Sequence, residues 1–301
     1  KEKIEKHDAI FFGAVGMPDR YPDHITLWGS LLKFRREFDQ YVNLRPVKLF
    51  NGVPCPLANK KPGDIDMLIV RENTEGFYAD RNMFLGSGEF MPTKDLALSV
   101  RKISRSGSRR IAFKAFEISM RRRKKVTIVH KANVLKMTDG LFLEEANDVA
   151  SNFPEIEVES LIVDAATAHI IRRPAEFDVL LTSNMYGDIL SDEAAELSGG
   201  LGLGGSINIG DRYGIAQAAH GSAPDIAGKG IANPVALMLS TALLLDWLGE
   251  THRRDDLKSA SKKYNDAINA VLLESANHTA DLGGKQSTKK FGDAVVTQIN
   301  K

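Results

Sequence analysis

The sequence predicts an α/β fold, because short apolar runs of strand length alternate with amphipathic helical segments along the chain. Residues 66–71, 125–130 and 178–183 are such runs, rich in the Val, Ile and Thr residues that favour strands. Polar side chains cluster where the strands end, at residues 71–78, Lys131, Asp164 and Asp188. Ligands of open α/β sheets bind beyond the carboxyl ends of the strands, so this edge is the predicted functional site.

The other elements follow from apolar spacing and turn residues. A strand at residues 8–12 leads into a turn with Gly13 and Gly16, and residues 43–50 are extended because the residue before Pro46 avoids the α region. Residues 157–163 form a further strand, and residues 79–94 are expected to be irregular and to form an arm. The predicted helices are 27–38, 104–122, 141–153, 165–171, 186–197, 235–248, 256–275 and 291–299.

Charge and composition exclude several classes of protein. The 301 residues carry 40 Lys and Arg against 39 Asp and Glu, which leaves no net field for nucleic acid or an anionic membrane. The basic run at residues 121–125 is interpreted as a solvated helix end. No apolar run is long enough to span a membrane, and no signal peptide is visible. Cys55 is the only cysteine, which fits a reducing compartment, and we expect a cytoplasmic location. The chain opens on Lys1 and enters a strand at once, so we expect that N-terminal residues are missing.

Two aspartates stand out where a strand passes into a helix. Asn184 is expected to leave the strand and cap the helix, and Asp188 and Asp192 are four residues apart and so share one helix face. Two carboxylates there repel each other unless a cation lies between them, and Mg²⁺ takes one or two carboxylates plus substrate oxygens. The alternative is an acidic, solvated first turn that the helix dipole favours.

Two glycine-rich segments offer backbone N–H groups. Residues 199–205 are either a loop that cradles phosphate or a flexible connection, since they lack the Lys-Ser/Thr of a P-loop. Residues 220–234 are rich in small residues and turn formers. His220 within them is either a structural or a functional histidine.

Taken together, these segments resemble the β-decarboxylating dehydrogenase family, which includes isopropylmalate, isocitrate, homoisocitrate and tartrate/D-malate dehydrogenases. The resemblance covers nearly all of the chain. Its signature is at residues 184–192 and 199–203, and its adenosine-binding loop is at residues 220–225 and 231–234. The substrate segments match at residues 32–36, 43–46, 70–78 and 130–134.

The resemblance implies a two-domain fold with a mixed parallel and antiparallel sheet, distinct from a true Rossmann fold. Residues 1–40 with 199–301 would form a discontinuous cofactor domain, and residues 41–198 a substrate, metal and dimerisation domain. It also implies NAD and Mg²⁺ or Mn²⁺ as cofactors, and a homodimer whose two active sites each borrow Lys131 and Asp164 from the other subunit.

The resemblance assigns a role to each matching residue. Lys131 would accept the proton of the substrate hydroxyl, and Tyr78 would protonate the enol. Arg35, Arg45 and Arg71 would clamp the substrate carboxylates, because a guanidinium suits bidentate binding. The remaining assignments are the metal ligands Asp164, Asp188 and Asp192 and the cofactor-binding residues Asn133, His220, Gly221, Ser222, Ala223, Asp225, Ile226 and Asn233.

The chain departs from the family pattern in two places. The initial strand and the Gly-Asp-Gly-Ile-Gly loop are absent, and Gln217-Ala-Ala stands where the family commonly has Glu-Pro-Val. Gly29-Ser-Leu-Leu with His24 and Trp28 is similar to the tartrate/D-malate branch, whereas Lys131-Ala-Asn-Val-Leu is similar to the isopropylmalate branch.

The sequence thus predicts an NAD- and divalent-metal-dependent oxidative decarboxylase of D-malate or tartrate. The alternative substrates are 3-isopropylmalate, isocitrate and homoisocitrate. A catalytically silent regulatory subunit would have lost Lys131, Tyr78 or an aspartate, and all are present. A protein that only binds metal would not need the adenosine loop. Asp225 predicts a preference for NAD over NADP.

Overall fold

The chain divides into two compact units. The computed structural model describes residues 2–78 and 88–301. The first unit comprises Lys1–Gln40, Leu44–Asp66 and Asp192–Lys301, and the second comprises Tyr41–Asn43 and Met67–Ser191. The functions expected for each domain remain predictions.

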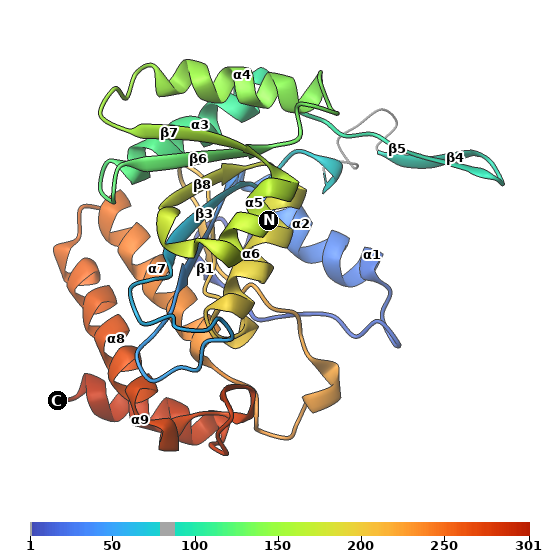
Figure 1. Ribbon diagram of the computed structural model, residues 1–301. Helices are drawn as coiled ribbons and strands as arrows, with labels where there is room; N and C mark the ends of the chain where they lie inside the picture. Colours follow the sequence, from blue (N-terminus) through green and yellow to red (C-terminus); the bar gives the residue numbers. More distant parts are fainter. Residues whose placement is uncertain (1, 79–87) are drawn as a thin grey trace. The chain divides into compact units, whose positions relative to one another are not determined.

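The second unit is built on four parallel strands. In sheet order they are β3 (Asp66–Glu72), β8 (Val179–Thr182), β6 (Lys125–His130) and β7 (Glu157–Ile162). β3, β6 and β8 are apolar in their central residues and almost fully buried, as expected for strands covered on both faces. Because all four strands are parallel, their carboxyl ends lie at one edge of this sheet (Figure 1).

Four helices accompany these strands: α3 (Arg105–Ser119), α4 (Thr138–Ala150), α5 (Val163–Arg172) and α6 (Asn184–Leu197). Ser104 caps α3 by accepting the Gly107 N–H at 3.0 Å, which confirms the predicted helix start. The helices α4, α5 and α6 directly follow β6, β7 and β8, so each begins at the sheet edge where the polar residues cluster.

The first unit contains the mixed part of the sheet. β1 (Ala9–Phe11) is parallel to β10 (Gly214–Ala216), and β10 is antiparallel to β9 (Ile207–Ile209). β2 (Val42–Lys48) follows β9 in the sheet order and has its first two residues in the second unit. The α/β class and the mixture of parallel and antiparallel pairing are therefore confirmed.

Helices supply most of the core of the first unit. α7 (Val235–Thr251), α8 (Asp255–Leu273) and α9 (Thr288–Ile299) enclose a cluster of buried apolar side chains that includes Val235, Ile268 and Phe291. In place of the single predicted helix 27–38, three consecutive helical segments form, namely α1 (Asp23–Thr26), the π-helix η1 (Leu27–Leu31) and α2 (Leu32–Glu37). Within the described ranges, no helix is both long enough and apolar enough to cross a membrane.

One sequence-based interpretation was wrong, and another was incomplete. The segment at residues 199–205 is packed, since a Cβ on Gly199 would lie 2.4 Å from Val53 Cγ1 and one on Gly205 would lie 2.8 Å from Leu239 Cβ. It is therefore not a flexible connection. The basic run at residues 121–125 follows the end of α3 and none of its residues is buried, as predicted. In addition, Arg122 Nε donates to Asp178 Oδ1 at 2.7 Å, and Asp178 is 1% exposed.

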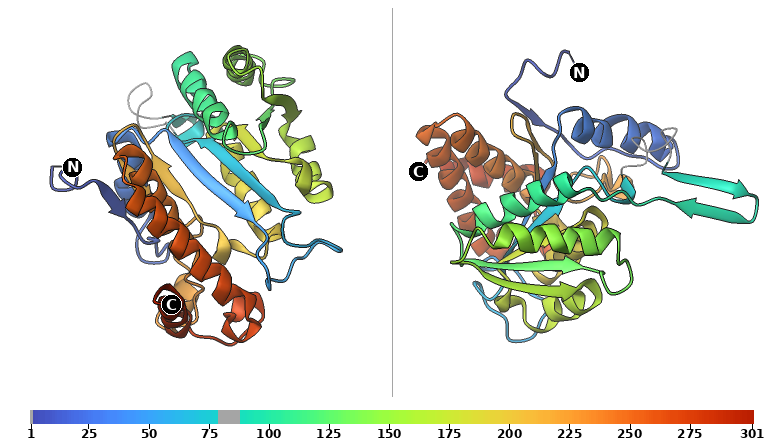
Figure 2. Two further views of the ribbon diagram at one scale, coloured as in Figure 1. Left: turned by 90° about the vertical axis from the view of Figure 1, so that its left-hand side faces the viewer. Right: turned by 90° about the horizontal axis from the view of Figure 1, so that it is seen from above.

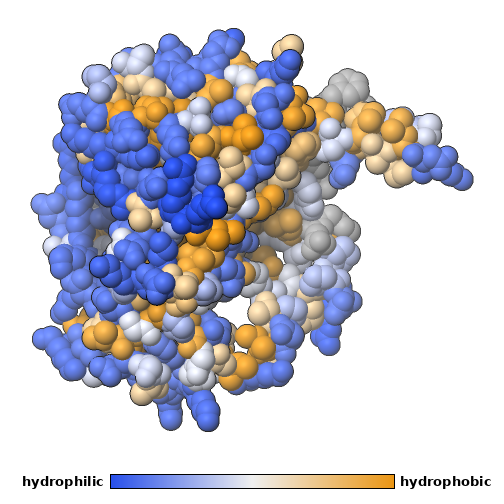
Figure 3. All heavy atoms as spheres, in the orientation of Figure 1, coloured by the Kyte–Doolittle hydropathy of each residue, from blue (hydrophilic) through white to orange (hydrophobic). Residues whose placement is uncertain are grey.

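A two-stranded hairpin projects from the second unit. It consists of β4 (Glu89–Thr93) and β5 (Leu96–Ser99), paired antiparallel, and every residue of both strands is exposed (Figures 1 and 2). Hydrophobic side chains lie on its surface (Figure 3), among them Phe90, Met91 and Leu96. The predicted arm is thus partly a regular hairpin, and its part at residues 79–87 lies outside the described residues.

Candidate functional site

Strand β3 delivers a buried guanidinium to the first turn of α6. Arg71 is 1% exposed, and its Nε and Nη2 donate to Asn184 Oδ1 at 3.0 and 2.7 Å. Its Nη1 pairs with Asp188 Oδ1. Asn184 therefore lies inside α6 and holds Arg71 with its side-chain oxygen, so the prediction that it caps the helix was wrong.

The second oxygen of Asp188 accepts the Tyr78 hydroxyl. This hydrogen bond measures 3.0 Å, and the Arg71 guanidinium lies 5.5 Å from the centre of the Tyr78 ring. The chain returns from β3 to Tyr78 through a turn in which the Glu72 carboxylate accepts the N–H groups of Thr74 and Glu75 at 2.9 and 2.7 Å. Burial raises the pKa of Glu72. The structure thus brings together three predicted site residues, Arg71, Tyr78 and Asp188.

Gly187 leaves the space that the Arg71 side chain occupies. A Cβ added to Gly187 would lie 2.6 Å from Arg71 Cγ, although Gly187 is in a helix, where alanine is usually preferred. Sequence analysis did not identify Gly187, because a single glycine in a helical pattern shows no partner.

We expect Gly187→Ala to destabilise the protein by about 1–3 kcal/mol, as overpacking does, and to displace Arg71. The matched control is Gly140→Ala in α4, where an added Cβ meets nothing within 4 Å and helix propensity should raise stability by up to about 1 kcal/mol. Denaturant unfolding of both variants measures the difference. A Gly187→Ala protein as stable as the Gly140→Ala protein would contradict the packing argument.

Lys131 and Asp164 form a second group, at the ends of β6 and β7. Lys131 Nζ lies 2.5 Å from Asp164 Oδ1, and this hydrogen bond lowers the pKa of Asp164. Asp164 is in the first turn of α5, and 60% of its side chain is exposed. Burial lowers the pKa of the preceding His130, whose Nδ1 accepts the Ala132 N–H at 3.0 Å, as a neutral imidazole can. Asn133 is exposed on the turn that follows.

The other predicted substrate and metal residues belong to the first unit. Arg45 Nη1 on β2 donates to Asp192 Oδ1 at 3.1 Å; the side chain of Arg45 is buried and that of Asp192 is 49% exposed. Arg35 is buried in the last turn of α2. Next to Asp192, burial raises the pKa of Glu193 to about 7. Each α6 aspartate therefore pairs with an arginine from a different strand.

A divalent cation fits the ligand types that this chain offers. Asp188 and Asp192 present carboxylate oxygens one helical turn apart on α6, and both side chains are accessible, at 32% and 49%. Among residues 2–78 and 88–301, no three His, Cys, Asp or Glu side chains lie close enough to hold a metal alone. Magnesium and manganese suit such a site, because they accept few protein carboxylates and complete their shell with water and substrate oxygens.

A pocket of about 930 Å³ lies in the first unit around the segment at residues 220–234. Six of the predicted cofactor residues line it: His220, Gly221, Ser222, Ala223, Ile226 and Asn233. Ser222 Oγ donates to the Gly16 carbonyl at 2.6 Å, which ties this segment to the turn after β1. Asp225 is exposed in the short 3-10 helix Pro224–Ile226, and Asn133 belongs to the second unit. The cofactor contacts of all eight residues remain predictions.

Sequence analysis missed part of this pocket. Asp281 lines it and accepts the Asn233 Nδ2–H at 2.9 Å and the Thr279 hydroxyl at 2.5 Å. Gly202 lines it too, and a Cβ there would lie 2.5 Å from Asp281 Oδ2. Leu201 and Gly202, within the segment 199–205 that was one candidate for a ligand loop, therefore lie at the pocket wall. Asp281 was missed because the sequence Asp281-Leu-Gly-Gly indicates a turn and nothing more.

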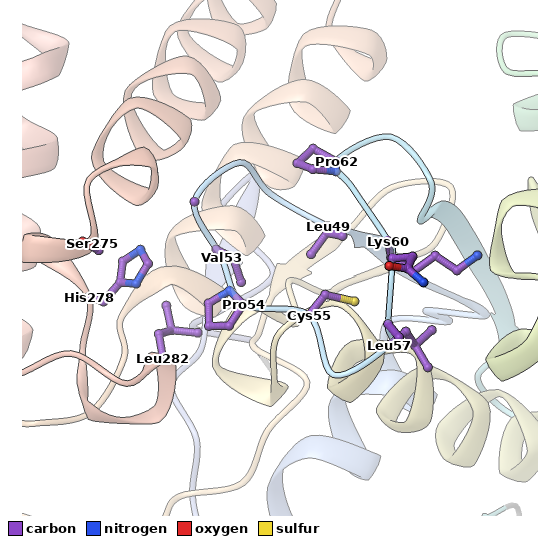
Figure 4. A pocket seen from close by; sticks show the side chains of 13 residues that line it. Leu49, Val53, Pro54, Cys55, Leu57, Lys60, Pro62, Ser275, His278 and Leu282 are labelled. Atoms are coloured by element: carbon purple, nitrogen blue, oxygen red, sulfur yellow. The ribbon is translucent and has the colours of Figure 1, made fainter.

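A second pocket of the first unit, of about 690 Å³, offers no comparable chemistry. Lys60 and His278 lie on opposite sides of it (Figure 4). The His278 ring is 3% exposed, and its Nε2 lies 2.8 Å from the Leu272 carbonyl. The Cys55 thiol donates to the Leu197 carbonyl at 3.3 Å.

Comparisons with known proteins show which family the chain belongs to. The family model described as isocitrate/isopropylmalate dehydrogenase matches residues 1–295. D-malate dehydrogenase (decarboxylating) of Escherichia coli is 43% identical over 98% of this chain and 81% of its own length. A 3-isopropylmalate dehydrogenase of Corynebacterium aurimucosum is 46% identical over 99% of this chain and 83% of its own length.

A solved structure leads to the same family. The crystal structure of isocitrate dehydrogenase from Methylococcus capsulatus superimposes with a TM-score of 0.87 at 36% identity, covering 100% of this chain and 84% of that one. Together with the matching family model, this similarity shows that the chain belongs to the isocitrate/isopropylmalate dehydrogenase family of decarboxylating dehydrogenases.

Proposed function

We propose that this protein catalyses the NAD- and Mg²⁺- or Mn²⁺-dependent oxidative decarboxylation of a D-malate-type 2-hydroxy diacid. The observation that carries the proposal is the environment of Asp188, whose two carboxylate oxygens meet the Arg71 guanidinium and the Tyr78 hydroxyl. In the second unit, Asp188 thus contacts both Arg71 and Tyr78. Asp188 is the proposed metal ligand, Arg71 the proposed group for a substrate carboxylate, and Tyr78 the proposed proton donor. Both substrate binding and proton transfer require groups of these kinds.

The side chains of the chain divide the work as follows. Arg35, Arg45 and Arg71 bind the substrate carboxylates, and their burial fixes the direction of the guanidinium groups. Nζ of the partner's Lys131 accepts the proton of the substrate hydroxyl. NAD, when bound, would be the acceptor of the hydride. Tyr78 returns a proton to the carbon that loses CO₂. Asp188, Asp192 and the partner's Asp164 would hold the divalent ion, which would supply Lewis-acid stabilisation.

The segment at Gly29-Ser-Leu-Leu32, with Trp28, supports a substrate of the tartrate/D-malate type. This segment lies on η1 and α2, immediately before the predicted carboxylate-binding Arg35. The second candidate is 3-isopropylmalate, favoured by Lys131-Ala-Asn-Val-Leu135 and by the 46% identity to a 3-isopropylmalate dehydrogenase.

A panel of 2-hydroxy diacids, with NAD or NADP and with or without Mn²⁺, tests the substrate class. We expect D-malate or tartrate to give the highest kcat/KM and every active acid to need the metal. A clear preference for 3-isopropylmalate would replace the proposed substrate with the second candidate. Failure of all 2-hydroxy diacids would overturn the proposed function.

We expect NAD to be preferred over NADP by on the order of 10- to 100-fold in kcat/KM, because the Asp225 carboxylate repels a 2′-phosphate at close range. Asp225→Ala should reduce this preference. Lys229 follows within the same segment, and its charge could attract the 2′-phosphate of NADP. The variant Lys229→Ala is therefore the control that measures how far this attraction offsets the repulsion by Asp225. A wild-type protein that prefers NADP would refute the cofactor assignment, and an unchanged preference in Asp225→Ala would refute Asp225 as the selector.

We also propose that the active form is a homodimer. The β4–β5 hairpin is exposed on all its residues and carries Phe90, Met91, Leu96 and Leu98 on its surface. An isolated two-stranded hairpin is at best marginally stable in water, so a second copy of the chain covering it would account for its sequence. The exposed Asp164 carboxylate, paired with Lys131, supports the sharing of residues between subunits.

A further inference from the structure

A buried ion pair in the second unit has no role in the chemistry described above. Arg101 Nη1 pairs with Asp139 Oδ1, and the two side chains are 6% and 1% exposed. Removing one partner of such a pair leaves an uncompensated buried charge, and the pair itself is often no more stabilising than apolar side chains of the same size. Its presence at this place therefore calls for a reason other than stability.

The second oxygen of Asp139 holds the backbone of Lys131. Asp139 Oδ2 accepts the Lys131 N–H at 2.6 Å, across the turn that joins β6 to α4. This hydrogen bond holds the main chain at Lys131, because β6 ends at His130 and the Lys131 N–H lies beyond the hydrogen bonds of the strand. The direction in which the Lys131 side chain leaves the main chain thus depends on Asp139, and the orientation of Asp139 depends on Arg101.

Arg101 reaches the segments of two more site residues. Its Nη2 donates to Ser183 Oγ at 2.9 Å, immediately before Asn184, which holds Arg71. Its guanidinium lies 5.8 Å from the ring centre of Phe77, the neighbour of Tyr78. The next residue, Lys102, exchanges backbone hydrogen bonds with Gly76 at 2.8 and 3.3 Å. One side chain thereby connects the segments of Lys131, Tyr78 and Arg71.

From these contacts we infer that Arg101 and Asp139 are positioning residues, which place the Lys131 amino group for proton transfer. The inference rests on the proposed role of Lys131 in the proposed function. Neither residue is among the predicted substrate-binding residues. Displacing a reacting group by about 1 Å lowers turnover on the order of 100-fold, so the pair affects kcat strongly without contributing to binding.

The chain contains a matched control for this pair. Asp178 is also 1% exposed, and it also accepts an arginine side chain, Arg122 Nε at 2.7 Å, and a backbone N–H, that of Arg123 at 2.8 Å. The Arg123 side chain adds a longer ion pair, with its Nε 3.9 Å from Asp178 Oδ1. It lies just before β8, at the opposite end of the parallel strands from Lys131. Asp139→Asn and Asp178→Asn therefore remove the same charge from similar surroundings, and only the first change touches a site segment.

The test compares the two variants as dimers with D-malate, NAD and Mn²⁺. We expect Asp139→Asn to lower kcat on the order of 100-fold, with both KM values within about two-fold of wild type, and Asp178→Asn to keep kcat within about two-fold. Arg101→Lys, which retains a cation beside Asp139 and loses the Ser183 contact, should give an intermediate kcat. Equal kcat values for Asp139→Asn and Asp178→Asn would overturn the inference. If Asp139→Asn does not fold, a kcat of Arg101→Lys equal to that of the wild type would overturn it instead.

Amide hydrogen exchange provides a readout without substrate. In Asp139→Asn the Lys131 amide should exchange faster on the order of 10-fold, while the amides of Val126–Val129 in β6 are unchanged. In Asp178→Asn the Arg123 amide should accelerate instead. An unchanged Lys131 amide would overturn the inference even if kcat falls. If wild-type protein oxidises no 2-hydroxy diacid, the proposed function fails, and the exchange experiment still decides whether the pair holds Lys131.

Discussion

Replacing Asp188 or Asp192 with Asn is expected to lower kcat by about a thousand-fold or more at saturating Mn²⁺, while the protein stays folded. A metal Lewis acid contributes several kcal/mol of transition-state stabilisation, and about 4 kcal/mol corresponds to a thousand-fold in rate. Asparagine keeps the shape of the side chain and removes the charge that holds the cation.

The structure explains why the fold should survive. In Asp188→Asn, the buried Arg71 keeps its two hydrogen bonds to Asn184. In Asp192→Asn, residue 192 is half exposed, so water can hydrogen-bond to the new side chain after the charge is removed. The matched control is Glu196→Gln, one turn further along α6, where the side chain accepts the Leu201 N–H at 3.1 Å. Circular dichroism checks the fold and initial rates check turnover. Near-normal rates in both aspartate variants would refute the metal assignment.

Mixing two inactive variants, Lys131→Ala and Tyr78→Phe, should restore about a quarter of the wild-type activity. If subunits exchange randomly, half of the dimers contain one copy of each variant, and in these one of the two sites combines an intact Tyr78 with an intact Lys131. The expected recovery is large because each variant alone lacks a proton-transfer group, whose loss costs on the order of 100- to 10,000-fold.

The control for this experiment is a mixture that cannot complement. Tyr78→Phe mixed with Asp188→Asn should remain inactive, because both residues contact each other within one chain and so serve the same site. Mass spectrometry of differently tagged subunits verifies the exchange. Complete exchange without recovery of activity in the first mixture would show that the two active sites do not share Lys131.

Local patterns were sufficient to predict the strands and the edge where the site lies. Short apolar runs such as residues 66–71 predict buried strands by their length, and parallel strands bring Arg71, Lys131, Asp164 and Asn184 to one edge. The helix at Asp188 and Asp192 follows from apolar spacing. The roles of individual side chains came from the family resemblance.

Long-range contacts of single side chains were beyond the reach of sequence analysis. Asn184 has the chemistry of a helix cap, and only the three-dimensional position of Arg71 shows why it serves another purpose. Gly187 and Gly202 are needed because Arg71 and Asp281 occupy the space of a Cβ, and no local pattern encodes that neighbour. The same holds for Arg122, which looks like a solvated cation and instead pairs with the buried Asp178.

The most direct test of the central claim is the stoichiometry of the reaction with D-malate. Wild-type protein with NAD and Mn²⁺ should release one CO₂ for each NADH formed, should stop when the metal is chelated, and should resume when Mn²⁺ is added back. NADH formation without CO₂, or turnover that persists under chelation, would contradict a metal-dependent oxidative decarboxylase.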